Sequence, residues 1–296
     1  MRVTGSMQNI QLLRNLRNIN FAMTQGQQEL ATGQRISKPS DDPVGVGYQM
    51  RYDTDLARSE EFLMNAQTGT EILKTMDSLM QQASDVLKRV RTLALQGANG
   101  TLDSQQRQTI SAEVKQLKEQ MVTIGNSTYN GRYLFNGQKT DQAPYTVNGA
   151  AGENTDPGLY YLNVSPAVKV PVSITGEIVF GEANSPNNVF GVLDELISAL
   201  DSNNVEGISA SVDKIDAATD HMAISWAEIG ARMNRFDLMD NRIQGEQVSI
   251  KEQRSNVADV DFSEAIMNLK MKENVLQAAL STGARIMQTS LLDFIR

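Results

Sequence analysis

Hydrophobic residues recur every three or four positions along two long tracts of the chain, and neither tract contains a proline. This period places the hydrophobic residues on one face of an α-helix and is typical of helices that pack in bundles or coiled coils. The first seam consists of Phe62, Ala66, Gly69, Leu73, Met76, Met80, Ala83, Leu87, Val90, Ala94 and Gly97. The second seam consists of Ile208, Val212, Ile215, Thr219, Met222, Trp226, Ile229, Met233, Phe236, Asp240 and Ile243. The two tracts predict long helices of one bundle.

A shorter seam over residues 110–124 follows the first tract. Residues 96–101 between them are rich in glycine and asparagine, and Asp103 or Ser104 can cap a new helix. We therefore predict an αα-hairpin. In the second tract, Asp240 and Gln247 are polar residues at seam positions. We expect the bundle to thin there, so that the seam meets solvent.

The two ends of the chain carry narrower heptads. The first consists of Leu12, Leu16, Ile19, Met23, Gly26 and Leu30, and the second of Leu269, Lys272, Leu276, Ala279, Gly283 and Ile286. A lone helix with so thin an apolar stripe is marginal in water. Each end therefore needs a partner, which could be the other end, a neighbouring subunit, or both. The last residues are strongly apolar and indicate an interaction site: Leu291, Leu292, Phe294 and Ile295.

Proline separates an insert from these helical tracts. Five of the seven prolines lie between residues 144 and 186, and proline is strongly unfavourable inside helices. Three segments of this window, at residues 160–164, 168–172 and 177–180, are rich in β-branched and aromatic residues. We predict a compact β-rich insert of two to four strands over residues 138–186.

Composition removes several classes of function. The 296 residues include no cysteine and one histidine, which excludes disulfides, thiol nucleophiles and cysteine-ligated metals. The net charge is −8, with +3 on residues 1–36, +1 on residues 262–296 and −12 on the rest. An acidic body argues against nucleic acid or anionic lipid as the main partner. No apolar run reaches the length of a membrane span, and the first residues lack the apolar core of a cleavable signal peptide.

Few residues form a pattern that suggests chemistry. Asp41 and Asp42 lie between Pro39 and Pro43, but two adjacent carboxylates without an ordered ligand series are weak evidence for a cation site. We interpret this segment as a kinked connector that caps the next helix. A possible dinucleotide loop at residues 45–47 lacks its third glycine and a preceding strand. We expect no catalytic residue, no cofactor and no metal site.

Several segments resemble the bacterial flagellin superfamily. Residues 29–36 (ELATGQRI) with Asp41 and Asp42 are similar to its N-terminal signature, and residues 264–292 to its C-terminal one. Four segments are closer to the superfamily branch that joins hook and filament than to filament flagellins. These are residues 35–43 (RISKPSDDP), 133–137 (YLFNG), 230–235 (GARMNR) and 278–286 (AALSTGARI).

The resemblance implies a mainly α, elongated helical rod with its N- and C-terminal helices paired. Residues 1–44 with 262–296 would form an inner assembly domain, 45–137 with 187–261 a helical rod domain, and 138–186 an outer insert. The implied partners are the first hook-associated protein, flagellin, copies of the chain in a ring and an export chaperone. The implied location is the extracellular flagellum, reached by type III export without a cleaved signal.

The contrast between strong central and weak terminal heptads suggests that the ends order only on assembly. We expect the assembly interface to include Leu12, Leu16, Ile19, Met23, Leu30, Leu269, Leu276, Ile286, Leu291, Leu292 and Phe294. Three alternatives stay open at this point. They are a filament flagellin, a coiled-coil signalling or adaptor module, and an enzyme that relies on carboxylates, serines or lysines.

Overall fold

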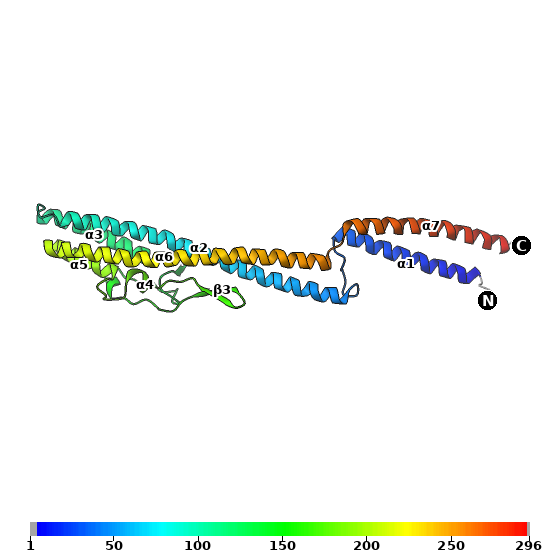
Figure 1. Cartoon of the computed structure of the whole chain (residues 1–296), viewed down its shortest axis with the longest axis horizontal. Coiled ribbons are helices and arrows are strands. Elements are labelled where there is room, and N and C mark those ends of the chain that lie inside the picture. The colour runs from blue at the N-terminus through cyan, green and yellow to red at the C-terminus, as the bar shows by residue number, and fades with distance from the viewer. Residues whose placement is uncertain (1–4, 295–296) are drawn as a thin grey trace. The chain divides into compact units, whose positions relative to one another are not determined.

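The computed structural model describes the backbone of residues 5–294, and the side chains of residue 7 and residues 9–285. The chain divides into two compact units. The terminal unit comprises Met1–Arg58 with Glu246–Arg296, and the bundle unit comprises Ser59–Gly245. Two long helices, α2 (Pro43–Gly97) and α6 (Val205–Ala258), contribute residues to both units (Figure 1). The finer three-way division into inner, rod and insert domains stays a prediction.

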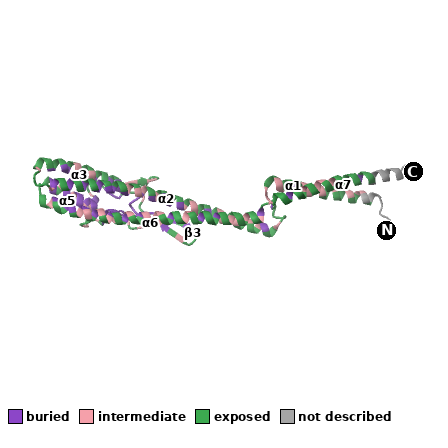
Figure 2. Ribbon diagram, turned by 45° about the horizontal axis from the view of Figure 1, so that its top comes forward, coloured by how far each residue is buried: buried purple, intermediate pink, exposed green. Residues whose placement is uncertain are grey.

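The bundle unit packs α2 and α6 with two shorter helices, α3 (Ser104–Gly125) and α5 (Val189–Asp201). Most predicted seam positions of α2 and α6 are buried, as Figure 2 shows by their purple colour. The heptad pattern therefore identified both helices correctly. The helix α2 begins earlier than its seam, because Pro43 suits a first helical position and no later residue interrupts it.

Close packing between α2 and α6 depends on a glycine. A Cβ atom added at Gly69 of α2 would lie 2.5–2.9 Å from three ring atoms of Phe236. The Phe236 side chain is fully buried. Its ring therefore lies directly on the α2 backbone, in a space that any side chain at residue 69 would occupy.

The hairpin between α2 and α3 ends in a capping box. The Asp103 carboxylate accepts the Gln106 backbone N–H at 2.7 Å, and the Gln106 side chain accepts the Asp103 N–H at 3.1 Å. This confirms the predicted cap at the start of α3. Behind it lies a residue that the sequence pattern did not single out, Arg107, which is 3% exposed.

The Arg107 guanidinium joins two turns of the bundle. It donates to the carbonyl oxygens of Gly97 and Asn99, each at 2.9 Å, and to the side-chain oxygen of Asn203. Residue 97 is the last residue of α2, residue 99 lies in the α2–α3 turn, and residue 203 lies in the α5–α6 turn. A single buried cation therefore holds this end of the bundle together.

Replacing Arg107 by methionine is expected to lower the free energy of unfolding of the bundle unit by about 2–3 kcal/mol, because two carbonyls lose a charged donor. Chemical denaturation followed by the fluorescence of Trp226, the one tryptophan of the chain, measures this change. Arg89→Met is the control, because Arg89 lies on the surface of α2 in a solvent-exposed pair with Glu113. Equal losses of unfolding free energy in the two variants would contradict a stabilising role of the Arg107 hydrogen bonds.

The insert is only partly β-structured. Strands β3 (Tyr161–Ser165) and β4 (Val168–Pro171) form an antiparallel hairpin, which confirms two of the three predicted segments. A 3₁₀ helix, η1 (Ala150–Gly152), precedes them. A smaller hairpin of β1 (Thr128–Tyr129) and β2 (Arg132–Tyr133) follows α3.

The third predicted strand, at residues 177–180, is wrong. These residues form the short helix α4 (Gly176–Phe180). Val179 and Phe180 are adjacent and both fully buried, and a strand would point them to opposite faces. The Phe180 ring contacts Phe135 edge-to-face at 5.5 Å and Tyr145 at 5.7 Å between ring centroids, so the helical turn places this ring in an aromatic cluster.

The prediction that the seam meets solvent at Gln247 is also wrong. Gln247 is 8% exposed. In the terminal unit α6 still lies against α2. The Nε atom of Arg254 on α6 donates to Asp53 Oδ1 on α2 at 2.5 Å. Within the terminal unit α6 therefore packs beside α2, and the seam is still covered at Gln247.

Candidate assembly interface

Helices α1 (Gly5–Thr32) and α7 (Phe262–Phe294) lie side by side in the terminal unit (Figure 1). A Cβ at Gly26 would lie 3.7 Å from Leu269, and a Cβ at Gly283 would lie 2.7 Å from Leu12. The two helices therefore run antiparallel. The heptads alone left the partner of each end open, whereas the resemblance implied that the two ends pair, and the structure confirms their pairing within one chain.

The predicted interface residues of this pair are only half-buried. Those with described side chains are Leu12, Leu16, Ile19, Met23, Leu30, Leu269 and Leu276. The side chains of Ile286, Leu291, Leu292 and Phe294 lie outside the described residues. Figure 2 shows the difference in colour between this pair and the buried seams of the bundle. Two helices cover one face of each other, so the pair cannot exclude water as the bundle does.

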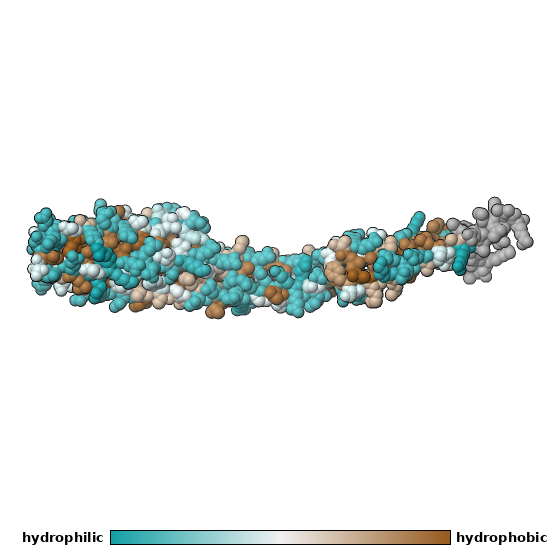
Figure 3. Space-filling view, turned by 90° about the horizontal axis from the view of Figure 1, so that it is seen from above, coloured by the Kyte–Doolittle hydropathy of each residue, from teal (hydrophilic) through white to brown (hydrophobic). Residues whose placement is uncertain are grey.

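Further hydrophobic side chains on the pair point to solvent. They are Met7, Ile10, Leu13 and Phe21 on α1, and Phe262, Ile266, Met267, Met271, Val275 and Leu280 on α7. Figure 3 shows hydrophobic patches on the surface of the terminal unit. Sequence reasoning missed these residues because it followed the seam alone. Met267, Met271 and Val275 are four residues apart and form a second apolar stripe that the pattern could have revealed. Exposed apolar surface of this kind marks an interaction site.

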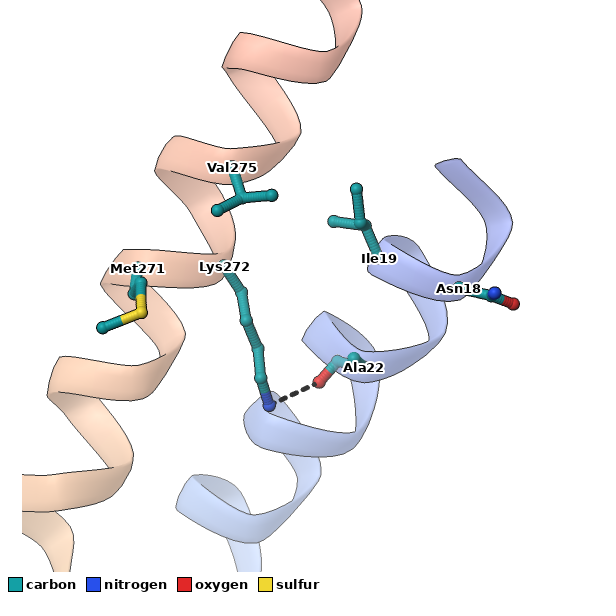
Figure 4. A pocket seen from close by; sticks show the side chains of 6 residues that line it. All are labelled: Asn18, Ile19, Ala22, Met271, Lys272 and Val275. Atoms are coloured by element: carbon teal, nitrogen blue, oxygen red, sulfur yellow. Dashed lines mark hydrogen bonds between the residues drawn. The ribbon is translucent and has the colours of Figure 1, made fainter. Parts of the chain in front are cut away.

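A cavity of about 270 Å³ opens between the two helices (Figure 4). It is lined by Asn18, Ile19, Ala22, Met271, Lys272 and Val275. Lys272 occupies a seam position, and its ammonium donates to the carbonyl oxygen of Ala22 at 3.2 Å. A cation at the seam weakens the isolated pair relative to an apolar residue and leaves room beside it.

The connector after α1 holds α1 to the end of α6. Gly33 adopts a φ of +71°, which ends α1, and its carbonyl accepts the Val260 N–H at 3.0 Å. The Arg35 N–H donates to the Ala258 carbonyl at 2.8 Å, and its guanidinium donates to the Val257 carbonyl at 2.7 Å. The connector is therefore fixed to the end of α6 by two backbone hydrogen bonds and by the Arg35 guanidinium.

Both connector aspartates bind backbone amides. Asp41 accepts the Lys38 N–H at 2.9 Å, and Asp42 caps α2 by accepting the Gly45 N–H at 2.9 Å. The hydrogen bond from Lys38 lowers the pKa of Asp41, and the bond from Gly45, with Arg35 nearby, lowers the pKa of Asp42. Pro39 lies in the turn, and Pro43 is the first residue of α2.

The connector is expected to loosen in acid. Both carboxyls have pKa values below the ordinary 3.8, so their stabilisation is present above that pH and is lost as the pH falls through the folded pKa. An NMR titration below pH 4 should show the Gly45 amide resonance moving together with protonation of Asp42. In Asp42→Asn that pH dependence should vanish. An unchanged Gly45 titration in the variant would contradict the cap.

No catalytic constellation is evident among the described residues. Within the same part of the chain, no group of three His, Cys, Asp or Glu side chains could hold a metal ion. None of the helices there is long and apolar enough to cross a membrane. The most distinctive surface is the helix pair with its exposed apolar residues, and such a surface can bind other helices.

Comparison with known families agrees with this architecture. The bacterial flagellin N-terminal helical region matches residues 3–140, and the bacterial flagellin C-terminal helical region matches residues 212–295. Together they cover about three quarters of the sequence. The chain belongs to the bacterial flagellin superfamily.

Individual relatives match along their whole length. Flagellar hook-associated protein 3 of Salmonella typhimurium is 24% identical, with 100% of both chains covered. That of Escherichia coli is 26% identical over 94% of this chain and 95% of its own. A flagellin of Listeria innocua is 24% identical over 98% of this chain and 96% of its own.

Two crystal structures share the fold. FlgL of Xanthomonas campestris has a TM-score of 0.61 at 20% identity and covers 69% of this chain and 99% of its own. The flagellar junction protein FlgL of Legionella pneumophila has a TM-score of 0.59 at 16% identity and covers 72% of this chain and 100% of its own.

Proposed function

We propose that this chain is a structural protein of the bacterial flagellum that joins the hook to the flagellin filament. The observation that carries this proposal is the terminal helix pair, which leaves half-buried and exposed apolar side chains on both α1 and α7. The full-length similarity to flagellar hook-associated protein 3 supports it.

The mechanism proposed is assembly-coupled ordering. In the isolated chain the α1–α7 pair buries little apolar surface, so it is only marginally stable. In the junction, neighbouring helices would cover the exposed residues, among them Phe21 and Met271. The free energy of that burial would offset the conformational entropy lost when the ends become ordered.

The proposed neighbours follow from the junction role. The first hook-associated protein would lie on one side and flagellin on the other, with copies of the chain forming a ring. An export chaperone would hold the C-terminal part before export, and the chain would leave the cell by type III export without a cleaved signal. The connector residues Pro39, Asp41, Asp42 and Pro43 would set the path of the chain between α1 and α2. No enzymatic activity is part of this function.

Gene deletion tests the proposal. Cells that lack the chain should build intact hooks and shed flagellin into the medium, and expression of the chain should restore attached filaments. Loss of the hooks themselves, or normal filaments in the deletion strain, would contradict a junction role.

The Listeria flagellin similarity keeps filament flagellin as the alternative. Purified chain that polymerises into long filaments without any junction partner would favour that alternative. Detection in the cytosol alone, never in flagella or culture fluid, would instead favour a signalling or adaptor module.

A further inference from the structure

Helix α6 has a second apolar face in the bundle unit, on the side opposite its buried seam. The outer stripe consists of Ala217, Ile224, Ala227, Ala231 and Leu238, and Ala223 and Gly230 flank it on the side toward the seam. Ile224 is 72% exposed and Leu238 is 67% exposed. Residues 217, 224, 231 and 238 are seven apart, so these residues stay aligned along the helix for about 32 Å.

The outer stripe is not a general property of the long helices. The corresponding exposed face of α2 in the bundle unit is polar from residue 67 to residue 92, with Gln67, Glu71, Ser78, Gln82, Asp85 and Thr92, and the next exposed hydrophobic side chain on α2 is Leu95. The two helices have nearly equal lengths, 55 and 54 residues, and they pack against each other. A solvated face on α2 and an apolar one on α6 indicate that α6 meets another surface.

The composition of the stripe suits a second helix at close range. Alanine and glycine allow helix axes to approach to about 8 Å. A Cβ atom at Gly230 would have nothing within 4 Å, so no contact inside this chain requires glycine there. Glycine in a helix interior costs about 1 kcal/mol relative to alanine, and close approach from outside would account for it.

Charge identifies the partner. Within residues 223–231 the one ionisable side chain is Glu228, and it pairs with Arg232 of the same helix. Over its full length the same face also carries exposed Asp220 and Arg235, whose opposite charges cancel, so the stripe is net neutral on a part of the chain that carries −12. A basic partner would bind the acidic surface instead, whereas two equally acidic bodies meet with least repulsion along a neutral strip.

We propose that the outer stripe of α6 is a contact surface for a second copy of this chain. The proposal rests on the proposed ring and names the face through which adjacent copies meet. The contact is one helix face, which is small for a stable interface, so isolated chains should stay monomeric and meet here only in the assembly.

The first experiment adds bulk and charge to the stripe. Ala227→Arg should reduce the amount of the chain in purified flagella at least tenfold, which corresponds to about 1.4 kcal/mol. Ser78→Arg on the polar face of α2 is the matched control and should assemble normally. Both positions are exposed, so the melting temperature of each purified variant should lie within about 2 °C of the parent.

The second experiment identifies the occupant. The chain has no cysteine, so Ala227→Cys provides a single site for a benzophenone–maleimide crosslinker. Illumination of assembled flagella should yield an adduct of two copies of the 32.6 kDa chain, and mass spectrometry should find no other protein in it. Ser78→Cys should give no such adduct.

The outcomes separate this inference from the junction role. If the parent chain is absent from the hook–filament junction, the proposed function fails. If the parent is present but Ala227→Arg assembles as well as Ser78→Arg, or both are lost equally, the stripe is not the contact. An adduct of Ala227→Cys with a different protein, or no adduct in flagella that contain it, would equally overturn the second copy as occupant.

Discussion

Phe236→Ala is expected to lower the free energy of unfolding of the bundle unit by about 3–5 kcal/mol, as for other buried phenylalanines. The ring is fully buried and rests on the α2 backbone at Gly69. The rigid helix cannot collapse into the space that the ring leaves. Chemical denaturation with Trp226 fluorescence measures the loss. The control is Leu238→Ala, two residues along the same helix and 67% exposed, which should change stability by less than about 0.5 kcal/mol.

A double-mutant cycle tests the contact itself. Gly69→Ala alone should destabilise the bundle unit by about 1–3 kcal/mol, because its methyl group would lie 2.5 Å from the Phe236 ring. In the Phe236→Ala background the same methyl group fills part of the cavity. The double variant should therefore be more stable than the sum of the single losses predicts. Strict additivity would show that the two residues do not share this space.

Leu16→Asp is expected to reduce the amount of the chain in flagella by about a hundredfold or more. A charge at a half-buried seam position cannot be covered without a cost of several kcal/mol in each subunit, and about 2.7 kcal/mol already corresponds to a hundredfold. The measurement is quantitative immunoblotting of purified flagella against total cellular protein. Unfolding of the bundle unit, followed by Trp226, should be unchanged because Leu16 belongs to the other unit.

Gln11→Asp is the matched control for this prediction, because it adds the same charge to an exposed position of α1. It should retain most of the parental incorporation. Normal incorporation of Leu16→Asp would contradict a role for the α1 seam in assembly. A loss of bundle stability in Leu16→Asp would instead attribute the defect to folding.

The heptad period predicted the long helices well, because buried apolar positions repeat with the helix itself. The position of Trp226 is a partial exception. The seam places it in the core, yet it is half-buried and its indole N–H donates to Asp77 Oδ1 at 2.6 Å. At the rim of a bundle, a tryptophan can bury the apolar part of its ring and still give its N–H a hydrogen-bond acceptor.

The errors have local physical causes. Residues 177–180 carry strand-like residue types, but no strand in the described part of the chain pairs with them, and Val179 and Phe180 are buried from a helical turn instead. Gln247 was expected in solvent because it is polar, whereas it is buried in the terminal unit, where Arg254 of α6 contacts Asp53 of α2. Arg107 had no sequence signal at all, since its partners are mainly backbone carbonyls of a turn that only the folded chain brings together.

The assembly surface could be predicted only in part. The narrow terminal heptads indicated that α1 and α7 need partners. Their pairing covers one face of each helix and leaves other apolar side chains exposed. The exposed stripe of Met267, Met271 and Val275 and the outer stripe of α6 lie on other faces, which a search for one seam per helix does not reveal. An apolar face that has no partner within one chain is recognised only when the folded structure shows that its side chains are exposed.

Hydrogen exchange tests the central claim most directly. Amides of residues 8–33 should exchange rapidly in the isolated chain, while those of the bundle core around Leu73 and Ile229 should be protected. In purified flagella the same terminal amides should become protected by several orders of magnitude. Protection of residues 8–33 in the isolated chain equal to that of the bundle core would contradict ordering of the ends by assembly.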